Sequence, residues 1–141
     1  HTQRWHADRK STGSGHLYQG RFKSFPVQDD DHFLTVCRYV ERNALRAKLV
    51  KRAEDWRWNS LSRWYSGTAA EKELLSAWPL RRTAGWVEEH VNSLQTDAEL
   101  AAIRRSVNRG SPFGDETWAT TATRKLGLEI TTRPQGRPRS K

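Results

Sequence analysis

The stretch DDDHFLTVCRYVERNALRAK, residues 29–48, carries the clearest structural pattern in the chain. Its three aspartates supply the capping oxygens and the negative charge that favour a helix N-terminus. Apolar residues then recur at intervals of four and three, with no glycine or proline between them: Phe33, Cys37, Val40, Ala44 and Ala47. This spacing predicts a helix over residues 30–48 that buries this face.

Upstream of this helix, aromatic and polar residues alternate over residues 20–25. That period predicts a strand with one buried face, which ends at Pro26 or lies at a sheet edge. Arg21 and Lys23 on this strand have two readings of equal weight. They contact DNA phosphates, or they form its solvated face.

Downstream, residues 55–61 predict a short capped turn in which Trp56 and Trp58 pack inward, with base stacking as the alternative role. Further helices are expected over residues 71–77, 83–94, 97–108 and 115–126. Asp97 and Asp115 are the expected N-caps of the last two, and Gly110 and Gly127 the expected ends.

The charge of the chain favours a polyanionic partner. It has 25 basic and 16 acidic residues, a net charge of +9, and residues 101–141 alone hold nine basic and three acidic residues. Basic side chains at phosphates release counterions, which drives nucleic-acid binding. No apolar run is long enough to suggest a membrane span. Cys37 is the only cysteine, so an internal disulfide and a thiolate zinc site are excluded.

A second stripe follows the expected helix beside its apolar face. Tyr39, Asn43 and Arg46 are spaced by four and three, so their side chains lie along one ridge. Side by side, the phenol could attack a phosphate, the amide oxygen could hold a divalent metal ion, and the guanidinium could bind a phosphate oxygen. The alternative is a boundary tyrosine beside solvated polar residues, which spacing alone favours.

Three blocks of sequence match a known family in order and spacing. They are GHLYQGRFKS at residues 15–24, RYVERNALRA at 38–47 and DWRWNS at 55–60. Together they resemble the REP-associated tyrosine transposases, which belong to the HUH (His-hydrophobic-His) superfamily of single-strand DNA nucleases. The resemblance continues weakly through RGSPFG at 109–114 to GRP at 136–138, so it covers nearly the whole chain.

The resemblance implies a specific chemistry. Tyr39 matches the nucleophilic tyrosine, and Asn43 matches the residue that completes a site for Mg²⁺ or Mn²⁺. The expected reaction is metal-dependent cleavage and transfer of single-stranded DNA, at hairpin-forming repeats, through a 5′-phosphotyrosine intermediate. The expected setting is the nucleoid of a bacterial cytoplasm, with a homodimer as a further expectation.

The sequence departs from the family in two respects. Nothing in it matches the paired histidines that precede the GHLYQG block, and Ala44 follows Asn43 where the family usually has proline. The chain also contains no methionine. We therefore expect a carboxy-terminal part of a transposase that is inactive alone.

The carboxy-terminal third is the expected DNA-binding extension. Arg104 and Arg105 lie on the predicted helix 97–108, which forms with helix 115–126 either a helix-turn-helix pair or a plain helical hairpin. Arg137 and Arg139 lie in a basic tail that either enters a minor groove or is merely solvated.

The predicted fold class is α+β, with one or two strands of a ferredoxin-like HUH nuclease domain and an otherwise helical chain. Residues 1–66 would carry the strand and the tyrosine helix, residues 67–130 a helical extension, and residues 131–141 a disordered tail. Three functions compete: a DNA strand transferase, a non-catalytic DNA-binding module, and a helical interaction domain whose charge only keeps it soluble.

Overall fold

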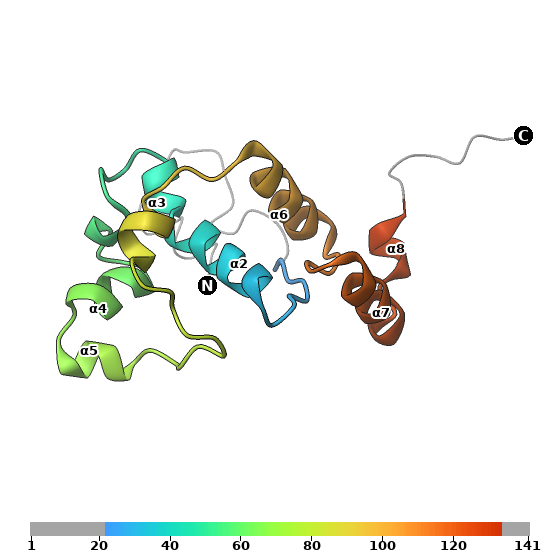
Figure 1. Cartoon of the computed structure of the whole chain (residues 1–141), viewed down its shortest axis with the longest axis horizontal. Coiled ribbons are helices and arrows are strands. Elements are labelled where there is room, and N and C mark those ends of the chain that lie inside the picture. Colours follow the sequence, from blue (N-terminus) through green and yellow to red (C-terminus); the bar gives the residue numbers. More distant parts are fainter. Residues whose placement is uncertain (1–21, 134–141) are drawn as a thin grey trace, which may run out of the picture.

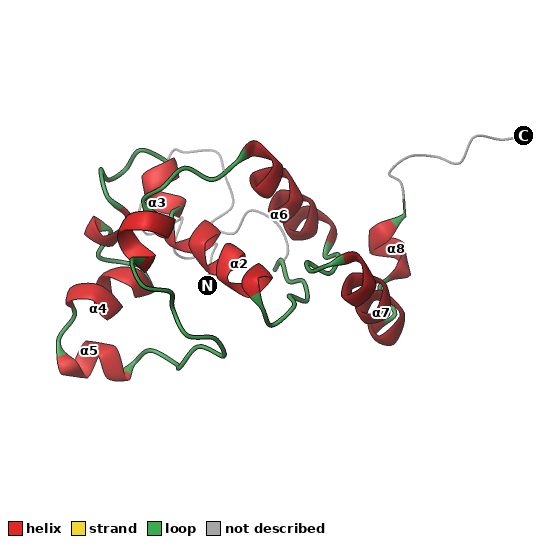
Figure 2. Ribbon diagram, in the orientation of Figure 1, coloured by secondary structure: helices red, strands yellow, loops and turns green. Residues whose placement is uncertain are grey.

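The computed structural model describes residues 22–133, which form a chain of short helices without a strand (Figures 1 and 2). The mainly helical part of the predicted class is therefore confirmed, and the strand is not found in this range. In chain order, the elements are α2 (Asp31–Glu41), α3 (Asn43–Arg46), the 3₁₀ turn η1 (Ala53–Asp55), α4 (Ser60–Ser66), α5 (Ala69–Glu73), the π-helical η2 (Trp86–Val91), α6 (Asp97–Arg109), α7 (Glu116–Leu126) and α8 (Glu129–Thr132).

The strand predicted over residues 20–25 is wrong for its described part. Residues 22–25 are irregular, Phe22 is 93% exposed, and Gly20 and Arg21 lie outside the described residues. A strand needs a neighbour that takes its backbone groups one after another. In the described residues this segment finds only one such contact, an isolated parallel bridge between Val27 and Phe113.

This bridge ties the segment before α2 to the turn before α7. The Gln28 N–H donates to the Phe113 carbonyl and the Phe113 N–H donates to the Pro26 carbonyl, each at 2.9 Å. The Gln28 amide then bonds twice with Asp115, from its Nε2 to Oδ2 and from the Asp115 N–H to its Oε1, both at 2.8 Å. Two segments almost ninety residues apart are thus held together.

The predicted helix over residues 30–48 forms as α2 and α3, which are divided at Arg42. Asp30 caps α2 by accepting from the His32 N–H at 2.8 Å, as the aspartate run predicts. Helical hydrogen bonds continue through the division, from the Arg42 N–H to the Arg38 carbonyl and from the Arg46 N–H to the Arg42 carbonyl. The chain therefore keeps nearly the predicted helical course.

The buried face of this helix is only partly the predicted one. Cys37 packs against the core and Ala44 is 6% exposed, as predicted, but Val40 is 58% exposed and Ala47 is exposed. Leu34 and Leu45 pack inward beside Cys37, against a core of Ala53, Leu61, Trp86, Val87 and Val91. Because the prediction treated charged residues as exposed, it left Glu41, which is 2% exposed, out of the buried face.

The later helices keep their predicted order but differ in extent. Residues 71–77 were expected to be helical, and α5 instead begins at Ala69, where Thr68 and Glu71 form a capping box. Residues 83–94 shorten to η2, which starts after Gly85 in the left-handed conformation (φ +68°). Here the hydrogen bonds reach back five residues, as from the Asn92 N–H to the Val87 carbonyl.

The two helices near the carboxyl end follow their predicted boundaries closely. Asp115 caps α7, and Gly110 and Gly127 end α6 and α7 in the left-handed conformation. Thr96, and not Asp97, is the N-cap of α6, because its hydroxyl and Glu99 form a capping box. The two helices make few contacts with each other (Figure 1), so they do not form the closely packed pair that a hairpin or a helix-turn-helix requires.

The tryptophans divide between core and surface. Trp86 is buried, and Trp64 and Trp78 pack against the core. Trp56 is half-buried, but Trp58 is 64% exposed, with the Arg57 guanidinium 4.3 Å from its ring centroid. The predicted inward packing is therefore wrong for Trp58.

The final described residues are more ordered than predicted. Thr131 and Thr132 belong to α8, although residues 131–141 were expected to be disordered. Arg109 holds this turn by donating to the Thr131 and Arg133 carbonyls. Residues 134–141, with Arg137 and Arg139, lie outside the described residues. Between residues 22 and 133, every helix is too short or too polar to cross a bilayer.

Candidate nucleic-acid interface around Tyr39

One face of α2 fixes the tyrosine helix to the segment that follows η2. Arg38 donates from Nη2 to the carbonyls of Ser93 (3.1 Å) and Leu94 (2.8 Å), and its Nη1 lies 3.4 Å from a Glu99 carboxylate oxygen. Arg42 is 6% exposed and donates to the carbonyls of Val91 and Ser93. Charged donors of this kind make the stronger hydrogen bonds. These two arginines therefore act as structural anchors of the helix.

Glu41, on the same inward face, belongs to a buried aromatic cluster. The Trp86 indole N–H donates to Glu41 Oε2 at 2.8 Å, and an Arg82 nitrogen lies 3.9 Å from Oε1. The Arg82 guanidinium is stacked between two rings, 3.6 Å from the Trp78 centroid and 4.2 Å from that of Trp64. Burial raises the pKa of Glu41 above its ordinary value, against the opposing effects of Trp86 and Arg82.

Cys37 lies one turn before Glu41 and shares its environment. Burial, with a smaller contribution from the Glu41 carboxylate, raises the pKa of the thiol to about 11. A thiol with so high a pKa is mostly unreactive at neutral pH. Cys37 is therefore a packing residue.

The outer ridge of the same helix brings Tyr39, Asn43 and Arg46 together, as the spacing predicts. The Arg46 guanidinium carbon lies 4.2 Å from the centroid of the Tyr39 ring. Its Nη2 donates to Asn43 Oδ1 at 2.8 Å, and its Nη1 donates to the Tyr39 carbonyl at 3.4 Å. Asn43 is exposed, and Tyr39 and Arg46 are half-buried. We call these three residues the tyrosine cluster.

The tyrosine cluster does not by itself fit a divalent metal ion. Mg²⁺ and Mn²⁺ prefer several oxygen ligands, carboxylates above all. Among residues 22–133, no three His, Cys, Asp or Glu side chains come close enough to hold an ion. The one amide oxygen available, Asn43 Oδ1, already accepts from a guanidinium. The described residues therefore offer a contact for a phosphate more readily than a site for a cation.

A hollow of about 470 Å³ opens on one side of the tyrosine cluster. Asn43 lines it together with Trp56 and Trp58. Val40 and Leu49, also in its lining, are 58% and 63% exposed. An aromatic and apolar surface of this kind suits the face of an unpaired base.

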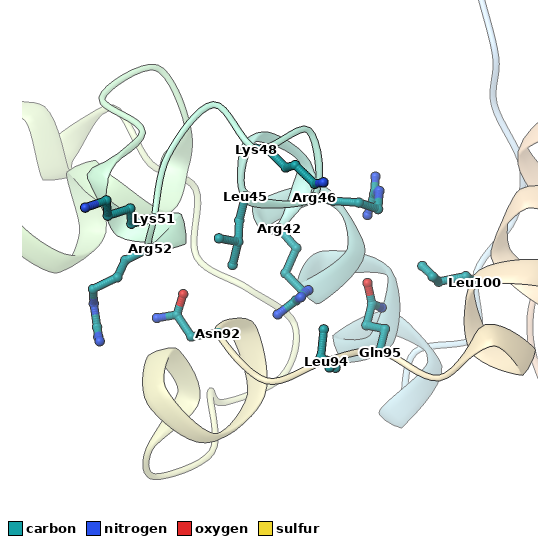
Figure 3. Close-up of a pocket in the computed structure, with 10 residues that line it drawn as sticks. All are labelled: Arg42, Leu45, Arg46, Lys48, Lys51, Arg52, Asn92, Leu94, Gln95 and Leu100. Carbon is teal, nitrogen blue, oxygen red and sulfur yellow. The ribbon is translucent and has the colours of Figure 1, made fainter.

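A second hollow, of about 460 Å³, opens on the other side, and we call it the basic groove (Figure 3). In Figure 3, Arg42 and Leu45 point from the helix toward the stretch 92–95 across the groove. None of the described residues in its lining is acidic. They are Arg42, Leu45, Arg46, Lys48, Lys51, Arg52, Asn92, Leu94, Gln95 and Leu100. Arg46 thus belongs both to the tyrosine cluster and to this groove.

The other predicted DNA contacts lie apart from the tyrosine cluster or outside the described residues. Lys23 is exposed on the irregular segment before Val27. Arg104 and Arg105 are exposed on α6, and Arg105 lines a separate hollow of about 760 Å³ with Arg109 and Arg133. Arg21, Arg137 and Arg139 are not described. The structure therefore brings together only Tyr39, Asn43 and Arg46 from the predicted set.

Sequence reasoning missed the lysines of the basic groove and the anchors of the helix. Lys48 and Lys51 line the same groove as Asn92 and Gln95 only because the chain folds back on itself. For the anchors a signal existed: Leu34, Arg38, Glu41 and Leu45 recur at intervals of four, three and four, with Arg42 next to Glu41, although three of these five residues are charged. No protein-family model, curated protein or solved structure matches the chain.

Proposed function

We propose that this chain carries the tyrosine helix and part of the DNA-holding surface of a DNA transposase. Tyr39 would be the nucleophile in the cleavage and transfer of a single DNA strand. The observation that supports this is the tyrosine cluster: a half-buried phenol beside a guanidinium and an exposed carboxamide, on a helix whose opposite face is anchored by buried charges. The resemblance of the RYVERN block to REP-associated tyrosine transposases supplies the reaction class.

The covalent step is a substitution at phosphorus. The Tyr39 phenolic oxygen forms a bond to the phosphorus of a phosphodiester, and the bond from phosphorus to O3′ breaks. The phenol loses its proton and the leaving O3′ gains one, so this oxygen departs as a 3′-hydroxyl. The products are a 5′-phosphotyrosine and a free 3′ end. Because the new bond is also a phosphodiester, the reverse attack rejoins strands without ATP.

Arg46 is the residue best placed to assist this step within the described chain. Its guanidinium lies over the Tyr39 ring and is charged at any physiological pH. Arginine binds phosphate oxygens through two parallel hydrogen bonds, which fixes orientation as well as charge. Arg46 would therefore hold the phosphodiester beside the phenol, and Asn43 Oδ1 would be released from its present contact.

A non-catalytic DNA-binding module is the second candidate. Two observations favour it: the basic groove, and the lack of a cluster of metal ligands within residues 22–133. The two candidate functions predict the same result for the chain alone, which should bind a DNA strand without cutting it. They differ once the chain is joined to a transposase segment that carries the paired histidines of the HUH superfamily.

The decisive experiment tests for a covalent adduct. The chain is fused to the histidine-bearing segment of a REP-associated tyrosine transposase and incubated with labelled single-stranded oligonucleotides and Mn²⁺. Adducts are resolved under denaturing conditions and mapped by mass spectrometry. We expect a 5′-linked adduct on Tyr39 that is absent from Tyr39→Phe, whose helical content and DNA affinity are unchanged. An adduct on another residue, or none from the fusion, would leave the binding module as the function.

A further inference from the structure

We infer that the basic groove holds the sugar–phosphate backbone of the DNA strand that reaches Tyr39, with Lys48 and Lys51 as its phosphate contacts. This inference rests on the proposed function, because it names the surface that would hold the strand beside the nucleophile. It adds two residues that lie outside the tyrosine cluster. The argument starts from the charges that line the groove.

Not every cation in the groove is free for a ligand. The Arg42 guanidinium is committed to the carbonyls of Val91 and Ser93. Arg52 is paired with Glu54, and a Glu88 oxygen lies 4.0 Å from it. These two side chains raise the local potential but have little bonding capacity left. They favour an anion without being its contacts.

Lys48 and Lys51 are the cations with capacity for a ligand. Both are exposed, and neither forms an ion pair with any described residue. In Figure 3, the Lys48 ammonium lies beside Arg46 at one end of the groove, and Lys51 lies near Arg52 at the other end, so that both ends of the groove carry a positive charge. A strand with one phosphate per nucleotide offers a matching series of negative charges.

The backbone at Lys48 supports a role beyond folding. Lys48 is the only described non-glycine residue with a positive φ, +58°, at the turn that ends α3. Helices commonly end with a glycine in this conformation, because a side chain there is strained. A lysine at this position makes the fold less stable than a glycine would, and Lys48 lines the basic groove. Strained residues of this kind cluster where ligands bind.

The groove also contains apolar surface, which favours a single strand over a duplex. Leu45 and Leu100 line it, and Leu94 is 88% exposed at its edge. A duplex presents phosphates with its base faces hidden, whereas a single strand presents phosphates and unstacked bases together. Gln95 also lines the groove, and its amide atoms are buried without a hydrogen-bond partner among the described residues.

The test is fluorescence anisotropy with the full chain and a labelled 20-nucleotide oligothymidine. Lys48→Gln/Lys51→Gln should bind roughly tenfold more weakly at low salt. The slope of log affinity against log salt should fall by about 1.4, for two lost phosphate contacts on a single strand. The matched control is Lys72→Gln/Arg81→Gln, which removes the same charge from exposed positions outside the groove.

Three outcomes would overturn the inference. The first is an equal loss of DNA affinity in the groove variant and in the control variant. The second is tighter binding of duplex DNA than of single-stranded DNA by the groove. The third is a loss of affinity for anionic lipid vesicles in the groove variant that is as large as its loss of affinity for DNA. Circular dichroism of each variant shows that the fold is retained. Lys48→Gly provides a second variant, since it removes the charge and relieves the strained backbone.

The inference and the proposed function fail separately. If the fused protein forms an adduct on Tyr39 and the groove variants still bind and react like wild type, the inference about the groove is wrong and the proposed nuclease function is retained. If the groove variants lose DNA binding and no form of the protein makes an adduct, the inference about the groove is retained and the proposed nuclease function is wrong.

Discussion

The guanidinium carbon of Arg46 lies 4.2 Å from the centroid of the Tyr39 ring, and its Nη2 donates to Asn43 at 2.8 Å. Arg46 is thereby held between the phenol on one side and the basic groove on the other. If the proposed function is correct, a positive charge in that position would serve both catalysis and DNA binding. The first prediction separates these contributions from a purely structural one.

Replacing Arg46 with methionine should weaken DNA binding and lower stability only modestly. A cation–π contact between half-buried side chains contributes about 1 kcal/mol, and the Arg46 hydrogen bond to the exposed Asn43 adds about as much, so the free energy of unfolding should fall by about 1–2 kcal/mol. Affinity for single-stranded DNA should fall several-fold, because a phosphate contact is lost. Urea unfolding and anisotropy measure the two effects. A large loss of stability with unchanged affinity would make Arg46 a structural residue only.

Lys48→Gly should move stability and affinity in opposite directions. Glycine adopts the left-handed conformation without the strain of a side chain, so the free energy of unfolding should rise by about 1 kcal/mol. DNA affinity should fall because a groove charge is removed. Thermal unfolding and anisotropy of the same preparation give both values. If affinity rises together with stability, Lys48 has no role in binding.

Arg82 should be essential to the core. Its removal leaves the Glu41 carboxylate buried with Trp86 as its only hydrogen-bonding neighbour, and breaking a buried ion pair is costly. We expect Arg82→Met to lower the free energy of unfolding by about 2–3 kcal/mol. Adding Glu41→Gln should restore part of this loss, because the unpaired charge is gone. Additive losses in the double variant would show that the two residues are not coupled.

The pH dependence of stability should report on Glu41. Burial raises its folded-state pKa above the ordinary value of 4.5, so its contribution is fully present below that pH and is lost as pH rises through the folded pKa. Glu41→Gln should therefore gain stability relative to wild type between pH 4 and pH 7. Urea unfolding of both proteins across this range measures the difference. A difference that stays constant, or that falls with pH, would contradict the assignment.

Cys37 should react slowly in the folded chain. With a pKa of about 11, its thiolate fraction at pH 8 is on the order of 100-fold below that of an ordinary cysteine. Alkylation followed by mass spectrometry should show this ratio between the native chain and the chain in concentrated urea. The native rate should keep rising with pH beyond pH 9. Equal rates in the two states would place the thiol at the surface.

The features that sequence could predict depend on local chemistry. The ridge of Tyr39, Asn43 and Arg46 follows from helical spacing, and the caps at Asp30 and Asp115 follow from side chains that reach their own backbone. Gly110 and Gly127 end their helices for an equally local reason. Each of these interactions spans only a few residues. Such patterns hold whatever the rest of the chain does.

The features that sequence missed depend on distant partners. The buried face of the tyrosine helix was predicted only in part, because Glu41 and Arg42 are buried by contacts with residues 82–93, forty or more positions away. The basic groove requires residues 42–52 and 92–100 to come together in a fold that no local pattern encodes. The strand was predicted from alternation alone, yet a strand depends on its neighbour. Trp58 shows the converse, an aromatic residue that composition assigned to the core.

The core of Ala53, Leu61, Trp86, Val87 and Val91 joins residues on both sides of position 66. A protein engineer who wanted only the tyrosine helix could not excise it there, since each half would expose the apolar surface that the other now covers. Any recombination that carries Tyr39 into another protein must transfer the chain from α2 through η2 as one block. The smallest unit that can be transferred with Tyr39 in its present setting is therefore several times longer than the helix that bears it.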